Sequence, residues 1–113
     1  MKQIRFYQII TAVCCLLLIS CGIDKNLKKG EKFLALGEYY DAADQFKQAY
    51  TKTPSKERAS RGKIALKMAR CYDKINSTPK AIAAYRNAVR YNQASIDDRL
   101  AYARLLLKNG EYK

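Results

Sequence analysis

The chain has 113 residues, with 22 Lys and Arg against 10 Asp and Glu, four Cys and no His. This length allows one domain at most. The absence of His removes the commonest general base and metal ligand, and with them every histidine-dependent catalytic triad. A hydrophobic content of 49% with only two Pro indicates a folded chain rather than a disordered one.

Residues 1–20 have the pattern of a targeting segment. Lys2 and Arg5 precede an apolar stretch from Ile9 to Ile19, and no acidic residue occurs before Asp24. The stretch is shorter than the roughly 20 apolar residues that a membrane-spanning helix needs, but it suits a secretory leader. We therefore expect a signal peptide over residues 1–20 and a mature domain over residues 21–113.

The segment Leu18-Ile19-Ser20-Cys21 resembles the lipobox of bacterial lipoproteins. The resemblance implies that the Cys21 thiol receives a diacylglycerol and that the chain is cut before Cys21, so that two or three acyl chains anchor it stably. Gly22 replaces the Asp that retains enterobacterial lipoproteins in the inner membrane. It is compatible with a lipid anchor in the outer membrane that faces the periplasm. The alternative is a plain secreted or membrane-anchored precursor in which Cys21 is incidental.

One cysteine remains after this processing. Cys14 and Cys15 would leave with the leader and Cys21 would carry lipid, so Cys71 has no partner for an intrachain disulfide. Cys71 lies in an apolar helical pattern, which predicts a small buried hydrophobic residue rather than a reactive thiol. No Cys and His cluster has the spacing of a metal site, so we expect no metal.

The mature chain repeats itself. Gly37-Glu38-Tyr39 recurs as Gly110-Glu111-Tyr112, and the row Ala42, Phe46, Ala49 recurs as Ala81, Tyr85, Ala88. These offsets of 73 and 39 residues indicate a period of 34, with about five extra residues between the first two units. Each unit has the apolar spacing of two helices, which predicts an all-α fold. Gly37 and Gly110 suit helix C-caps, and Thr78-Pro79 suits an N-cap followed by the first helical residue.

These units resemble the tetratricopeptide repeat (TPR), a helix-turn-helix unit of 34 residues. The small residue of its first helix is met by Gly30, Ala69 and Ala103, and the large residue three positions later by Phe33, Tyr72 and Leu106. The usual Trp is replaced by Asn26, Ala65 and Arg99, and the second unit turns through Asn76-Ser77-Thr78. The resemblance covers about residues 23–113. It implies an α-α superhelix of antiparallel helix hairpins, about two and a half repeats long.

The third unit stops at Lys113, just after its turn, so five helices are expected where six are due. Repeat arrays need a neighbour or a capping helix to cover each apolar face. We therefore expect residues 21–113 to be the N-terminal part of a longer protein. The alternative is an end that dimerises or frays.

Most of the positive charge lies in and just before the second unit. Residues 47–90 contain twelve Lys and Arg against Glu57 and Asp73. In TPR proteins the first helix of each unit lines a concave groove that binds proteins, so the resemblance implies such a groove here. The predicted groove residues are Lys63, Leu66, Lys67, Arg70, Lys74, Leu100, Arg104 and Lys108. The alternatives are a solvated face without a partner and a steering surface for an anionic partner.

These features predict a non-enzymatic, lipid-anchored scaffold of the cell envelope whose groove binds a protein partner. Residues 67–72 and 84–91 bear a looser resemblance to the Bacteroidota lipoproteins that join a TPR to an OmpA-like peptidoglycan-binding domain and are associated with type IX secretion. That resemblance implies a secretion or envelope-assembly complex, with peptidoglycan contact through a further C-terminal domain. The alternative function is a basic module that binds anionic membrane lipid or lipopolysaccharide. An envelope protein does not meet the chromosome, so no nucleic acid is expected.

The carboxylates do not indicate catalysis. Asp97 and Asp98 are adjacent, so they cannot both face one pocket from a helix, and we expect them at a helix start. Asp41 and Asp44 are expected in a first helical turn, where negative charge is favourable. We predict no catalytic residue, no cofactor and no enzymatic activity.

Overall fold

A computed structural model describes the backbone of residues 2–110 and the side chains of residues 5–13 and 21–110. The described chain is helical and contains no strand, which confirms the predicted all-α class. Tyr112 of the third turn and the lipobox side chains before Cys21 lie outside these residues. The helices are α1 (Lys2–Ala35), α2 (Tyr39–Lys52), α3 (Arg58–Lys74), α4 (Thr78–Arg90) and α5 (Ile96–Lys108).

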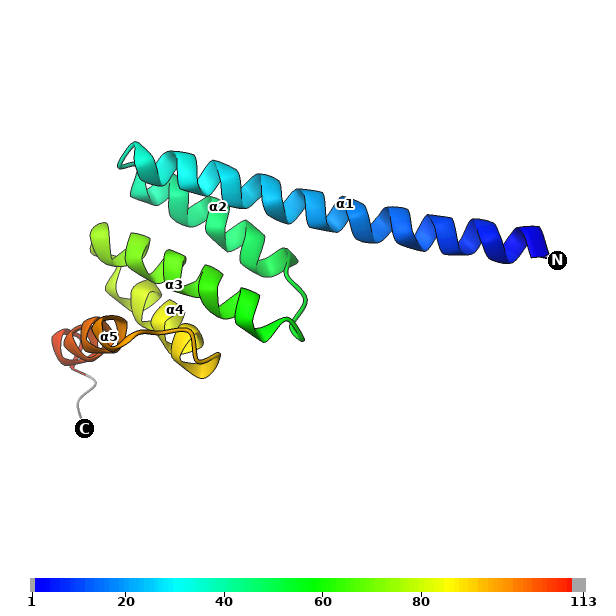
Figure 1. The fold of residues 1–113 in the computed structure, drawn as a ribbon. Coiled ribbons are helices and arrows are strands. Elements are labelled where there is room, and N and C mark those ends of the chain that lie inside the picture. The colour runs from blue at the N-terminus through cyan, green and yellow to red at the C-terminus, as the bar shows by residue number, and fades with distance from the viewer. Residues whose placement is uncertain (1, 111–113) are drawn as a thin grey trace.

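Each helix packs against the next one along the chain (Figure 1). The hairpin of α1 and α2 is followed by the hairpin of α3 and α4, and α5 occupies the place of the first helix of a third hairpin. The extents of 63 × 32 × 20 Å reflect this linear stacking and the length of α1. The predicted repeat-like arrangement of antiparallel hairpins is therefore present.

The core of each hairpin is the predicted row of small and aromatic residues. Ala42, Phe46 and Ala49 of α2 are each 0% exposed, and their counterparts in α4 are also buried. Alanine lets two helix backbones approach closely, and the aromatic ring fills the groove beside them. Gly30 of α1 completes the contact, because a Cβ atom there would lie 2.6 Å from Cε1 of Phe46. The small residue of the first helix is thus a packing requirement in this hairpin.

The turns after α1 and α3 share one geometry although their sequences differ. Gly37 has φ +75° after α1, and Asn76 has φ 58° at the same place after α3. In both turns the next backbone N–H donates to a carbonyl five residues back, from Glu38 to Phe33 and from Ser77 to Tyr72, each at 2.9 Å. Asn is among the few residues other than Gly that adopt this left-handed conformation. The second unit therefore departs from the repeat pattern in sequence and keeps its backbone turn.

The prediction for the start of α4 is wrong by one residue. Ser77 is the N-cap, so Thr78 is the first helical residue and Pro79 follows within the first turn. The left-handed turn at Asn76 leaves Ser77 as the last residue before helical geometry begins. Proline remains compatible with this place, because the first N–H groups of a helix have no intrahelical partner.

Helix α1 runs without a break from the predicted leader into the first hairpin, and its N-terminal half projects beyond the other helices (Figure 1). Side chains 5–13 and Cys21 are exposed, and Gly22 and Ile23 are the first described residues to be partly covered after them. Asn26, which stands in the position of the missing Trp, is buried. Its side-chain amide donates to Oε1 of Gln45 at 2.9 Å and accepts from Nζ of Lys52 at 2.6 Å. A polar network therefore joins α1 to α2 at the position where the TPR pattern has Trp.

Helix α5 has a mixed environment. Leu105 is 1% exposed, and the Tyr102 ring meets that of Tyr85 edge-on at 6.3 Å. Ala103 is exposed, as are Ile96, Leu100 and Leu107. The described part of the chain thus leaves one apolar stripe of α5 uncovered, as the repeat count predicted. Ala103, the repeat equivalent of Gly30 and Ala69, belongs to this stripe. It is exposed because no described helix packs against it.

Candidate binding groove

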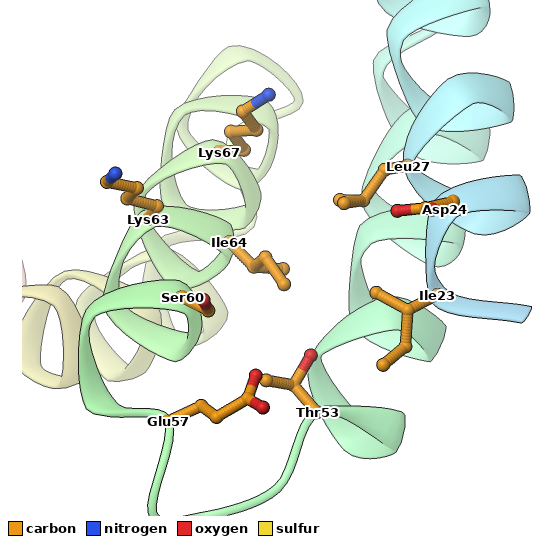
Figure 2. A pocket seen from close by; sticks show the side chains of 9 residues that line it. All are labelled: Ile23, Asp24, Leu27, Thr53, Glu57, Ser60, Lys63, Ile64 and Lys67. Atoms are coloured by element: carbon orange, nitrogen blue, oxygen red, sulfur yellow. The ribbon is translucent and has the colours of Figure 1, made fainter. Parts of the chain in front are cut away.

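Two adjoining hollows lie between α1 and α3, the first helices of the two hairpins. One has a volume of about 380 Å³ and the other about 540 Å³. Lys67 lines both, so they form one groove that we call the α1–α3 groove. The first hollow (Figure 2) is lined by Ile23, Asp24, Leu27, Thr53, Glu57, Ser60, Lys63, Ile64 and Lys67. The second is lined by Glu31, Leu34, Tyr39, Lys67, Arg70 and Lys74.

The floor of the first hollow is apolar. Figure 2 shows Ile64 reaching from α3 toward Leu27 on α1, with Ile23 below them. Ile23 and Leu27 are four residues apart, so they share one face of α1. Ile64 is buried, whereas Ile23 and Leu27 are half-buried and leave apolar surface at the groove. Leu34 and Tyr39 supply the apolar part of the second hollow.

The rim of the groove is charged. Lys63 and Lys67 come from α3, Asp24 comes from α1, and Glu57 precedes the start of α3 (Figure 2). Lys67 forms an ion pair with Glu31 across the groove, and its Nζ also lies 5.5 Å from the centre of the Phe46 ring. Lys67 therefore crosses the groove between its two hollows. Lys63 makes no ion pair with any residue that the structure describes, so it is available at the rim of the first hollow.

Arg70 is held by a carboxylate of α5. Its Nη2 lies 3.0 and 3.1 Å from the two carboxylate oxygens of Asp98, and its Nε lies 3.2 Å from Oδ1. Asp98 is buried and belongs to the capping box of α5, where Ser95 donates to Oδ2 from its backbone N–H and its hydroxyl. Burial opposes the charge on Asp98, but the hydrogen bonds from Ser95 and Arg70 outweigh it, so the pKa of Asp98 lies below its ordinary value. This confirms the expectation that Asp98 lies at a helix start.

A second ion pair also joins α3 and α5, but here the arginine belongs to α5 and the carboxylate to α3. Arg104 of α5 donates from Nη2 to Oδ2 of Asp73 on α3 at 3.0 Å. Arg70 and Arg104 are therefore bound to carboxylates within the chain. These two predicted groove residues connect α3 to α5.

The structure brings together half of the predicted groove residues. Lys63, Lys67, Arg70 and Lys74 line the α1–α3 groove. Leu66 packs against the core, and Leu100 and Lys108 are exposed on α5. The apolar floor and the α1 wall were missed. Leu27 could have been found, because the offsets of 39 and 34 residues make it the repeat equivalent of Leu66 and Leu100.

The two cysteines whose side chains are described differ in environment. Cys21 is exposed on α1, whereas Cys71 is buried in α3 at 1% exposure. Burial, with a smaller contribution from the negative charge of Glu31, raises the pKa of the Cys71 thiol to about 11. The thiol therefore remains protonated at neutral pH, and the prediction that Cys71 is a buried hydrophobic residue is confirmed.

Comparison of the chain with family models, curated proteins and solved structures gave no match. Among the described residues, no three His, Cys, Asp or Glu side chains gather as metal ligands would. Over the same residues, no helix combines the length and the apolar character that crossing a bilayer requires.

Proposed function

We propose that the protein is a non-enzymatic, lipid-anchored scaffold of the cell envelope whose α1–α3 groove binds a segment of a protein partner. The observation that carries this proposal is the groove itself, in which two adjoining hollows combine an apolar floor with a charged rim. Burial of apolar side chains on such a floor contributes affinity, and the charges set the orientation of the bound segment. The TPR resemblance stays a prediction, which the stacked hairpins support.

The position of Cys21 supports the anchoring part of the proposal. Cys21 is exposed, and among the described residues from Cys21 onward coverage of α1 begins at Gly22, next to the side chain of Lys52. Cleavage before Cys21 would therefore leave the packed part of α1 intact and place the acylated residue at its first turn. The location in the outer membrane, the link to type IX secretion and the contact with peptidoglycan rest on resemblance alone and stay predictions.

A photo-crosslinking residue in the groove tests the partner-binding proposal. Ser60 is suitable because it is exposed and lines the first hollow, and Ala83 is a matched control because it is exposed on α4 and lines neither hollow. Irradiation of intact cells should give a discrete protein adduct from position 60 and none from position 83. Equal labelling from both positions would contradict a specific groove.

A charge reversal at the rim sharpens this test. Lys63 makes no ion pair with a described residue, so we infer that the part of the segment at this rim is acidic. Lys63→Glu should then lower the yield of the position-60 adduct about tenfold, because it places a like charge against that segment. Lys80→Glu makes the same change in charge on α4, outside both hollows, and should leave the yield unchanged. An unchanged yield in Lys63→Glu would exclude an acidic segment as the occupant.

The alternative, a basic module built on residues 47–90, is weakened by the roles that several of these cations already have. Arg61 donates from Nη1 to the Thr53 carbonyl oxygen at 2.8 Å and lies 4.1 Å from the centre of the Tyr50 ring. It therefore binds the C-terminal end of α2, where a cation is favoured by the helix dipole. Lys67 and Arg70 are also bound to carboxylates.

A further inference from the structure

The lysines of α1 that follow Cys21 gather on one face of the helix. Over residues 22–46 the chain has four basic and five acidic side chains, so its net charge is close to zero. The four basic residues are Lys25, Lys28, Lys29 and Lys32, which are all exposed and follow the spacing i, i+3, i+4, i+7 of one helix face. We call them the lysine face of α1.

The acidic residues of α1, Asp24 and Glu31, stand four residues before and three residues after Lys28, so they border the lysine face on the side of the groove. Asp24 lines the first hollow of the α1–α3 groove, and Glu31 is paired with Lys67 of α3. None of the lysines of the lysine face makes an ion pair with a described residue. The lysine face therefore presents unneutralised positive charge to the solvent.

The exposed Cys21 continues this face toward the N-terminus. Cys21, Lys25, Lys28 and Lys32 stand at i, i+4, i+7 and i+11, which is one line along the helix. At about 1.5 Å of rise per residue, the line is roughly 16 Å long. Ile23, Leu27 and Leu34 lie on the far side of α1, where they meet the groove and the core.

We propose that the lysine face docks on the anionic phospholipid headgroups of the membrane that holds the acyl chains of Cys21. A surface dense in phosphate complements a row of unpaired ammonium groups, and basic residues next to a lipid anchor strengthen membrane binding. Helix α1 would then lie along the bilayer surface, with the α1–α3 groove turned away from it. This orientation rests on the proposed lipid attachment at Cys21, whereas the charge of the lysine face does not.

Vesicle binding by the full chain with Cys21→Ser tests the lysine face without acylation. In this background, Lys25, Lys28, Lys29 and Lys32 are changed together to Gln. The control changes Lys47, Lys56, Lys80 and Lys108 to Gln, which removes the same charge from exposed positions outside the groove. The leader is present in every variant, so its own affinity for lipid is common to all of them.

On phosphatidylcholine vesicles with about 30% phosphatidylglycerol at about 0.1 M salt, the lysine-face variant should bind about 100-fold more weakly than its parent. The affinity of the control variant for these vesicles should fall less than about fivefold, because the four lysines that it lacks lie on different elements of the molecule. Equal losses in both variants, or binding to lipopolysaccharide but not to phosphatidylglycerol, would overturn the proposal. On phosphatidylcholine alone, the variants should bind equally, and a difference there would also count against headgroup charge as the cause.

Mass spectrometry of the protein with Cys21 intact tests the anchor separately. If Cys21 is acylated and the lysine-face variant also loses vesicle binding, the two results together support docking beside the anchor. A bare Cys21 with the same loss would overturn the anchor and the proposed orientation, while the lysine face would remain a lipid-binding surface.

Discussion

Two spaces between first helices occupy equivalent places in the repeat but contain different side chains. We call the space between α1 and α3 the first interval and the space between α3 and α5 the second interval. The first contains the apolar floor of Ile23, Leu27 and Ile64 and a single ion pair, from Lys67 to Glu31. The second is crossed by two arginine–aspartate pairs, one of which includes the buried Asp98. The same helix geometry can thus carry an open groove or a charged junction, depending on which residues the first helices present.

The largest effect is expected from Phe46→Ala, which removes the ring on which the first interval depends. Phe46 is 0% exposed, contacts Gly30 and lies under Lys67. The lost burial and the cavity should lower the free energy of unfolding by about 3–5 kcal/mol. Chemical denaturation followed by circular dichroism measures this change. Tyr40→Ala, at a site that is 69% exposed, is the control, and a similar small loss in both variants would contradict the packing described for α1 and α2.

Arg70→Ala tests whether the second interval is held by charge. The substitution leaves the carboxylate of Asp98 buried without its guanidinium, which should lower the free energy of unfolding by about 1–3 kcal/mol, a range that allows for the exposure of Arg70. The double variant Arg70→Ala/Asp98→Asn should recover part of the loss, because Asn carries no charge to bury. If the double variant is less stable than Arg70→Ala, the pair does not act as proposed.

The acid-side pH dependence of stability tests the carboxylate of the second interval. The folded pKa of Asp98 lies below its ordinary value of 3.8, so the carboxylate stabilises the fold fully above pH 3.8 and progressively less as the pH falls through the folded pKa. In Arg70→Ala the free energy of unfolding should fall less steeply as the pH decreases, because the substitution removes one cause of the lowered pKa of Asp98. Denaturation curves between neutral and acid pH measure the slope, and an identical slope in both proteins would contradict the role of Arg70.

The differences between the intervals define what sequence reasoning could and could not predict. The alanine–aromatic rows and the glycine turns at Gly37 and Gly110 were predictable because they depend on residues close in the chain, whereas the start of α4 was predicted one residue too late. The Arg70–Asp98 pair joins residues 28 positions apart, so Arg70 was interpreted as a groove residue before its partner was visible. The polar network at Asn26 was missed for the same reason, since Gln45 and Lys52 come from α2. The lysine face was not predicted, because the net charge of residues 22–46 combines the four lysines of α1 with acidic residues that mostly lie in the following turn and in α2.

The smallest effect on stability is expected from Lys67→Met. This substitution removes the only ion pair that the described residues form across the first interval. It keeps an unbranched side chain near the ring of Phe46. Both partners of this pair are partly exposed, so its loss should change the free energy of unfolding by less than about 1 kcal/mol. Glu31→Gln should cost as little, and a double-mutant cycle should give a coupling energy of about 0.5 kcal/mol. A coupling as large as the loss in Arg70→Ala would mean that charge also holds the first interval together. A small coupling would instead show that apolar contacts stabilise this interval, and it would leave Lys67 able to exchange Glu31 for a carboxylate of the proposed partner.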